Sequence, residues 1–148
     1  MHIFTIGYEG IDQSQFLLWL SNYKINIVAD VRDLPLSRKK GFSKTALSDL
    51  LKKNNIEYIS YRELGAPKEL RSFLIKTKDY KTYFRKYKTI ISNNLDAVDK
   101  ILDTIKEGKN VALLCYEKNP AACHRSVVAD EVKKRDGNGL KIKHLGII

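Results

Sequence analysis

The chain has 148 residues, of which 43% are hydrophobic and 30% charged, with two cysteines and a formal net charge of +10. This length suits one domain with its own core, and two cysteines are too few for a secreted scaffold held together by disulfides. No segment approaches the ~20 apolar residues of a membrane span and no signal peptide is recognisable, so we expect a cytoplasmic protein without a membrane partner.

The first half of the chain alternates short apolar runs with amphipathic segments, a pattern typical of parallel β-α-β units. Strands are expected at residues 2–6, 25–31 and 57–61. Asp12, followed three residues later by Gln15, forms a capping-box pattern for the helix after the first strand. Ser43 is the expected N-cap of the helix after the second strand.

In the second half, apolar residues recur at helical spacing from Asp79 to Glu107, and Gly108 is the expected C-terminal cap. If this segment forms two helices, the break is expected at 92–94. The elements expected after it are a buried strand at 109–116, a helix at 120–135 with Asn119 as its N-cap, and an edge strand at 140–145. The sequence therefore predicts one α/β domain over residues 1–148, with about five mostly parallel strands flanked by helices.

Polar and reactive residues follow each of the first four expected strands. Because the carboxyl ends of parallel strands meet at one edge of a sheet, we expect these residues to gather around a pocket there. They are Gly7, Tyr8, Glu9, Gly10, Asp30, Arg32, Ser37, Glu63, Cys115, Glu117, Cys123, His124 and Arg125.

The two cysteines are the strongest candidates for chemistry at this edge. Cys123 adjoins His124 and Arg125 near an expected helix N-terminus, a setting that lowers a thiol pKa and makes the thiol a nucleophile or redox group. Cys115, at the end of a buried strand, would be its resolving or supporting partner. Two alternatives remain open for the pair: packing as small buried hydrophobes, and a reversible disulfide.

Metal ligation by the two cysteines is a further alternative, disfavoured as a structural zinc site, and the sequence does not identify a cofactor. Only His124 adds a conventional ligand nearby, so a metal would have to recruit Glu117, Glu9 or Asp30 from neighbouring loops.

Charged residues at the same edge suggest binding and proton-transfer roles. Arg32 and Arg125 would hold a carboxylate or phosphate in bidentate fashion, or Arg32 would instead pair with Asp30, Asp33 or Glu117. Glu117 suits a general acid or base, and His124 suits proton transfer near neutral pH. The backbone N–H groups of residues 7–10 would cradle a phosphate or simply form a turn.

Four ordered motifs resemble those of the DUF488 family. They are Thr5-Ile6-Gly7-Tyr8 (its TIG motif), Asp30-Val31-Arg32 with Pro35 and Ser37 (DVRxxPxS), Leu64-Gly65 (LGG, with Ala66 in the third position), and Leu113 to Glu117 with Cys123-His124-Arg125 (LLCxE…CHR). The resemblance runs from residue 3 to about His144 and implies a three-layer α/β fold with an enzyme site that contains the cysteines. It implies no particular reaction, because the family is named for its unknown function.

A second hypothesis concerns the basic segment 68–88, which has eight Lys or Arg residues, two acidic residues and interleaved aromatic residues. Further basic residues occur at Arg38, Lys39, Lys40 and Lys44. Such a surface can bind nucleic acid through phosphate contacts and base stacking. The helical spacing of the aromatic residues instead favours an amphipathic helix whose aromatic side chains are core.

We therefore expect a cysteine-centred enzyme that acts on a small anionic substrate. The alternative is a nucleic-acid-binding module in which the cysteine loop is structural or holds a metal. The sequence does not predict the oligomeric state.

Overall fold

A parallel β-sheet forms the middle layer of the molecule. The computed structural model describes residues 1–35, 37 and 39–146, so Arg38 of the second basic cluster lies outside the described residues. The sheet has five strands in the order β3-β2-β4-β1-β5, and every strand pair in the described part is parallel. The strands are β1 (His2–Gly7), β2 (Ile27–Asp30), β3 (Glu57–Ser60), β4 (Val111–Cys115) and β5 (Lys141–Leu145).

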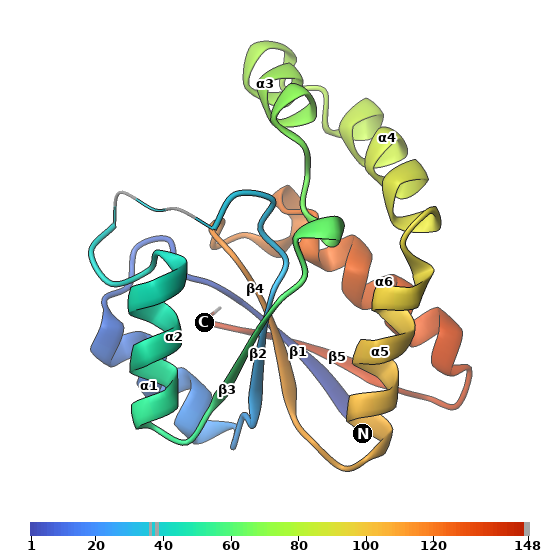
Figure 1. Cartoon of the computed structure of the whole chain (residues 1–148). Helices are drawn as coiled ribbons and strands as arrows, with labels where there is room; N and C mark the ends of the chain where they lie inside the picture. Colours follow the sequence, from blue (N-terminus) through green and yellow to red (C-terminus); the bar gives the residue numbers. More distant parts are fainter. Residues whose placement is uncertain (36, 38, 147–148) are drawn as a thin grey trace.

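Helices cover both faces of this sheet, which confirms the predicted α/β class. They are α1 (Gln13–Asn22), α2 (Lys44–Lys53), α3 (Lys68–Thr77), α4 (Tyr80–Ser92), α5 (Leu95–Lys106) and α6 (Arg125–Asp136), with short 3-10 turns η1 (Arg62–Leu64) and η2 (Pro120–Ala122). Figure 1 shows α1 and α2 on one face, α5 and α6 on the other, and α3 and α4 extending beyond the edge where β4 ends. No helix in the described ranges is long and apolar enough to cross a membrane.

The alternation of side chains along the strands produces the two cores. In β4, Val111 and Leu113 pack with the α4, α5 and α6 side, whereas Ala112 and Leu114 pack with the α1 and α2 side. All five residues of β4 are buried. A central parallel strand that is covered on both faces reads as a continuous apolar run, which is why the sequence predicted it.

The helix boundaries confirm some of the expected caps. Asp12 and Gln15 form the predicted capping box of α1. The predicted break at 92–94 is also present, since α4 ends at Ser92 and α5 begins at Leu95. Ser43 precedes α2 but makes no cap hydrogen bond, because its hydroxyl instead bonds to the backbone N–H and C=O of Ser37.

One predicted helix began at the wrong residue, and another helix was not predicted as a separate element. The helix expected at 120–135 begins only at Arg125, because Asn119 caps a short 3-10 turn and Cys123 is extended (φ −134°, ψ 141°). The helix not predicted separately is α3 (68–77), although Leu70, Phe73 and Leu74 recur at helical spacing.

The strand order opens a crevice at the carboxyl edge of the sheet. Strands β1 and β2 are followed by helices on one face, whereas β4, which lies between them, is followed by α6 on the other face. The connection that follows β4 therefore leaves the carboxyl edge of the sheet toward one face, and the connections that follow β1 and β2 leave it toward the other. In open α/β sheets this divergence marks the usual position of a ligand site.

Candidate functional site

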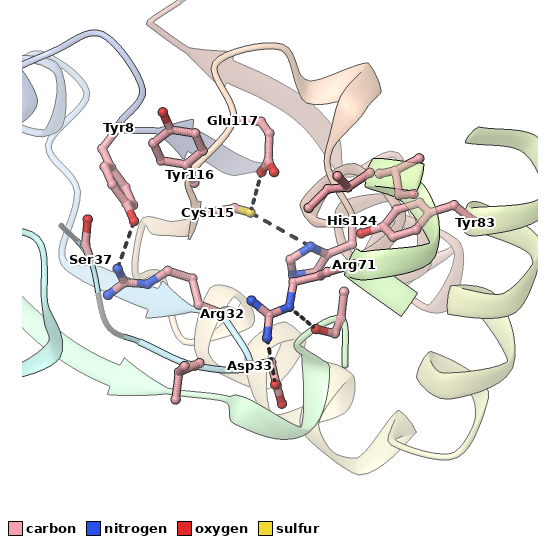
Figure 2. Close-up of a pocket in the computed structure, with 14 residues that line it drawn as sticks. Tyr8, Arg32, Asp33, Ser37, Arg71, Tyr83, Cys115, Tyr116, Glu117 and His124 are labelled. Carbon is pink, nitrogen blue, oxygen red and sulfur yellow. Dashed lines mark hydrogen bonds and ion pairs between the residues drawn. The ribbon is translucent and has the colours of Figure 1, made fainter. Parts of the chain in front are cut away.

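A cavity of about 390 Å³ lies at this crevice. Figure 2 shows the side chains that surround it. They come from the segments after β1, β2 and β4, from the segment after η1, and from α3 and α4. The lining residues are Tyr8, Arg32, Asp33, Leu34, Ser37, Ala66, Arg71, Leu74, Ile75, Tyr83, Cys115, Tyr116, Glu117 and His124.

Two thiols and one imidazole meet beside the cavity. The Sγ atoms of Cys115 and Cys123 each lie 3.8 Å from Nδ1 of His124. The three atoms lie within 4.8 Å of one another, and both cysteines are free and buried. The extended conformation of Cys123 and the start of α6 thus bring the CHR segment against the end of β4.

The orientation of the imidazole is determined by a neighbouring strand. Nε2 of His124 lies 2.6 Å from the carbonyl oxygen of Val31, which makes it the donor in that hydrogen bond. The ring also packs edge-to-face on Tyr87, with centroids 5.2 Å apart. Nδ1 is therefore the nitrogen that faces the sulfurs, and it can accept a thiol proton or ligate a metal.

The cluster shifts the pKa values of the two thiols in opposite directions. Burial raises the pKa of Cys115 well above its ordinary value, and the neighbouring Cys123 and Glu117 raise it further. Burial also opposes ionisation of Cys123, but hydrogen bonding from Cys115 and the charge of His124 bring its pKa well below the ordinary value. Burial likewise opposes charging of His124, and the negative charge of Cys123 overcomes it, so the pKa of His124 is raised. The arrangement favours a thiolate–imidazolium pair between Cys123 and His124.

Glu117 is the closest polar partner of Cys115. Its Oε2 accepts a hydrogen bond from Sγ of Cys115 at 3.1 Å (Figure 2). Burial raises the pKa of the Glu117 carboxyl group, and the charge of Cys123 adds to this. A carboxylate with a raised pKa is a stronger base, so Glu117 is placed to take the thiol proton.

The two cysteines are both buried but differ in their position relative to the cavity. Cys115 lines the cavity, whereas Cys123 is 1% exposed and is not among the described lining residues. The sequence hypothesis made Cys123 the substrate-facing thiol. In the structure, Cys115 lies at the cavity wall and Cys123 lies behind it.

Arg32 is held in the way that the structural alternative predicted. Its Nε and Nη2 form a bidentate pair with Asp30, at 2.9 and 2.7 Å. Its Nη1 donates to the backbone carbonyl of Phe42 and to the hydroxyl of Tyr8. Arg32 lies at the cavity wall, but most of its N–H groups are already hydrogen-bonded to these partners. Asp30 is fully buried next to it.

Arg125 lies outside the cavity wall. Its side chain is fully buried, with Nη1 donating to the carbonyl oxygen of Glu117 at 2.5 Å and Nη2 to that of Lys118 at 3.2 Å. These bonds shape the loop that carries Glu117. The predicted role of Arg125 as a direct anion ligand does not fit this placement.

The glycine-containing segment after β1 is a turn and offers no phosphate cradle. The backbone N–H groups of Tyr8 and Glu9 donate to the carbonyl oxygens of Cys115 and Tyr116. The Glu9 carboxylate accepts a bond from the Lys118 backbone and does not line the main cavity. Gly7 is buried, and a Cβ at this position would lie 1.9 Å from the carbonyl oxygen of Glu117, so the loop after β4 leaves no room for a side chain there.

Two other predicted residues lie at the cavity wall. The Tyr8 ring stacks on Phe42, with centroids 4.6 Å apart, and Ser37 contributes the far end of the wall. The hydroxyl of Ser37 accepts a bond from the backbone of Lys39.

Sequence reasoning missed Arg71 and Tyr83 as site residues. Both belong to the α3–α4 hairpin, and α3 itself was not predicted as a separate element. Asp33 had been considered only as a partner of Arg32, whereas it pairs with Arg71 at 3.5 Å. The helical spacing of 70–74 was the available signal for α3, but nothing in the sequence indicated which side of the helix would face the cysteines.

The basic segment 68–88 has mostly inward-facing aromatic side chains. Tyr83 and Tyr87 are buried and Phe73 and Phe84 are half-buried, which leaves Tyr80, 43% exposed, as the exposed aromatic residue of the segment. This arrangement matches the amphipathic-helix alternative. It leaves little aromatic surface for stacking on bases.

The chain was compared with known families and proteins. The family model described as Domain of unknown function DUF488 matches residues 13–132. This range includes the motifs at 30–37, 64–65 and 113–125, whereas the motif at 5–8 lies before it. The searches of curated proteins and of solved structures found no match.

Proposed function

Because the chain belongs to the DUF488 family, whose description assigns no activity, we propose a function from the site itself: an enzyme that uses the Cys115 thiol as a nucleophile toward a small anionic substrate. The observation that carries this proposal is the meeting of Cys115, Cys123 and His124 within 4.8 Å beside a cavity that Cys115 lines. A thiol within hydrogen-bond reach of a base is the usual arrangement for thiol catalysis, and Glu117 is the base in contact with Cys115.

In the proposed reaction, a bond forms between Sγ of Cys115 and an electrophilic atom of the substrate. The thiol proton passes to Glu117, whose Oε2 is 3.1 Å from the sulfur. The leaving group departs with the electron pair of the bond that breaks, and Glu117 returns the proton to it. Glu117 thus acts first as general base and then as general acid.

Cys123 and His124 lie next to Cys115, and in this reaction they do not exchange a proton with the substrate. The thiolate and imidazolium charges of the pair cancel, so the pair adds no net charge beneath the cavity. Sγ of Cys123 lies within 4.8 Å of Sγ of Cys115, so its side chain packs against the reactive sulfur and limits where that sulfur can lie. We therefore treat Cys123 and His124 as positioning residues.

Alkylation of the native protein tests the proposal. Iodoacetamide is added at neutral pH, and the modified cysteine is identified by peptide mass spectrometry over time. Cys115 is expected to react first, and Cys115→Ser should abolish the fast phase. Glu117→Gln should slow modification of Cys115 by about tenfold or more, because it removes the proton acceptor.

Cys123→Ser is the matched control, because it removes the other sulfur and leaves Cys115 and Glu117 in place. Cys115 is the one cysteine left in this variant, and it should still react in the fast phase. Preferential modification of Cys123 in the wild type, or two thiols that react only after unfolding, would contradict the proposed role of Cys115.

A second candidate function is a zinc-dependent site, favoured by the spacing of the ligand atoms. A tetrahedral zinc with bonds of about 2.3 Å to sulfur and about 2.1 Å to nitrogen sets these ligands roughly 3.6 Å apart. The two sulfur-to-Nδ1 distances are 3.8 Å, and the hydrogen bond from Nε2 to Val31 is the usual outer support of a ligating histidine. Three protein ligands beside a cavity would leave one position for water or substrate.

Metal content of the purified protein distinguishes the two candidates. A zinc enzyme should bind one equivalent of Zn²⁺ and lose it in Cys115→Ser, Cys123→Ser and His124→Ala. Its thiols should resist iodoacetamide until a chelator is added. The thiol enzyme instead should react at the same rate with and without the chelator.

A further inference from the structure

We propose that Arg71 and Tyr83 form an anion subsite beside Cys115 that selects substrates carrying a carboxylate. This inference rests on the proposed thiol function and names the groups that would orient its substrate. It replaces the anion-binding roles that the sequence suggested for Arg32 and Arg125.

The arginine side chains near the cavity differ in how many N–H donors remain available for a ligand. Arg32 directs Nε and Nη2 to Asp30, and Nη1 to Phe42 and Tyr8. Arg125 is fully buried away from the cavity wall. Four of the five N–H groups of Arg32 are thus in use, whereas Arg71 uses two of its five, so among the described lining residues Arg71 has the most guanidinium donors available.

Arg71 is held in place by two segments on the opposite side of the cavity from Tyr8. Its Nε donates to the carbonyl oxygen of Ala66 at 3.1 Å, and its Nη2 lies 3.5 Å from Oδ2 of Asp33. These two segments are pressed together, since a Cβ on Gly65 would lie 2.2 Å from the backbone nitrogen of Asp33. In residues 1–35, 37 and 39–146, Nη1 of Arg71 has no hydrogen-bond partner.

Tyr83 provides a second, independent donor. Its side chain is 97% buried, since only 3% of it is exposed, yet it lines the cavity. The described part of the chain offers its hydroxyl no hydrogen-bond partner. Burial and the nearby cysteine charges raise its pKa, so the hydroxyl remains a donor. Figure 2 shows this hydroxyl turned toward His124 and the Arg71 guanidinium between His124 and Asp33.

The surrounding charges define the class of anion. Asp33 and Glu117 also line the cavity and oppose a dianion such as phosphate. A carboxylate carries a single charge and matches the fork of a guanidinium. Its oxygens would bind Nη1 of Arg71 and the Tyr83 hydroxyl, and an electrophilic carbon next to the carboxylate would then face Cys115.

A pair of matched alkylating agents tests this inference. Iodoacetate and iodoacetamide have nearly the same size and leaving group, and only iodoacetate carries a carboxylate. In both reactions a carbon–sulfur bond forms at Cys115, the carbon–iodine bond breaks, iodide leaves and the thiol proton goes to Glu117. The measurement is the ratio of the two rate constants at Cys115.

In the wild type this ratio should exceed that of a free cysteine peptide. Arg71→Gln should lower it by about tenfold, the effect of losing one charged hydrogen bond, with a smaller drop in Tyr83→Phe. Asp33→Asn should raise it, because Arg71 is released from its ion pair. Arg85→Gln is the matched control: it removes the same charge from an exposed position on α4 outside the cavity wall, and it should leave the ratio unchanged.

The rate with iodoacetamide separates failure of this inference from failure of the proposed function. If Cys115 reacts with iodoacetamide in every variant but the ratio does not respond to Arg71→Gln, the anion subsite is ruled out and the thiol function stands. If Cys115 reacts with neither reagent in the folded wild type, the thiol function fails and the subsite with it.

Discussion

Position 7 has no room for a side chain, because the loop after β4 lies where a Cβ would be. A Cβ at this position would lie 1.9 Å from the carbonyl oxygen of Glu117 and would also approach the Arg125 guanidinium. Gly7 pairs with Cys115 in the sheet register, so a displacement of the backbone at Gly7 would also displace Cys115.

Gly7→Ala is therefore expected to lower the free energy of unfolding by about 2–3 kcal/mol, the cost of overpacking a tight contact. Urea denaturation measures the change. Gly139→Ala is the comparison: Gly139 has open space around it but a positive φ of 85°, and the substitution should cost only about 1 kcal/mol. Equal losses in the two variants would show that the loop yields to the added methyl group.

Arg125 is a structural residue by its contacts. Arg125→Met fills a similar volume and leaves the carbonyl oxygens of Glu117 and Lys118 without their charged donor. We expect a loss of about 3 kcal/mol in the free energy of unfolding. Arg85→Met, at an exposed position, should change it by less than about 0.5 kcal/mol. An Arg125→Met protein as stable as the wild type would show that the loop after β4 keeps its path without this charged donor.

At the scale of single elements, the first helix depends on its N-terminal cap. Oδ1 of Asp12 accepts the backbone N–H of Gln15 at 2.9 Å, and the Gln15 side chain accepts the N–H of Asp12 in return. Asp12→Ala should destabilise the protein by about 1 kcal/mol and speed hydrogen exchange at the Gln15 amide. Asp12→Asn keeps an accepting oxygen and should retain most of the stability. Similar exchange in both variants would mean that tertiary packing alone holds α1.

The contrast between α1 and α2 shows how far local patterns reach. Asp12 and Ser43 are both good N-cap residues, yet only Asp12 bonds to its own helix. Ser43 instead binds the backbone of Ser37, a partner supplied by the path of the preceding loop. Helix α3 shows the opposite limit: Leu70, Phe73 and Leu74 follow helical spacing, but only Leu70 is buried and no cap residue marks where the helix begins.

At the scale of the whole molecule, Asp136 connects the last helix to the last strand. Its Oδ2 accepts the backbone N–H groups of Asn138 and Leu140, and these bonds lower its pKa. A carboxyl group whose folded-state pKa is depressed adds stability above its unfolded pKa, and this stability is lost as pH falls through the folded value.

The free energy of unfolding should therefore fall as pH is lowered from about 5 toward about 2. Asp136→Asn should flatten part of this slope, because the amide does not titrate. Asp49→Asn, at an exposed position on α2, is the control and should keep the wild-type slope. Urea midpoints measured across this pH range provide the test. An unchanged slope in Asp136→Asn would assign the acid sensitivity to other carboxyl groups.

The sequence by itself determined the family, the α/β class and the gathering of reactive residues at one edge. These follow from properties that are local or periodic: apolar runs for buried strands, helical spacing for amphipathic helices, and the shared direction of parallel strands. The motifs at 30–37 and 113–125 carried the family resemblance for the same reason, since their residues are close in the chain.

Only the tertiary structure decided which of these residues face the cavity. An arginine can bind a ligand only through N–H groups that are not already hydrogen-bonded within the protein. The carbonyl oxygens that accept hydrogen bonds from Arg32 and Arg125 belong to loops whose paths the sequence does not reveal. The order of Cys115 and Cys123 relative to the cavity depends on one extended residue before α6. Arg71 and Tyr83 reach the site because the α3–α4 hairpin extends beyond the sheet edge, an arrangement set by packing across segments distant in the chain.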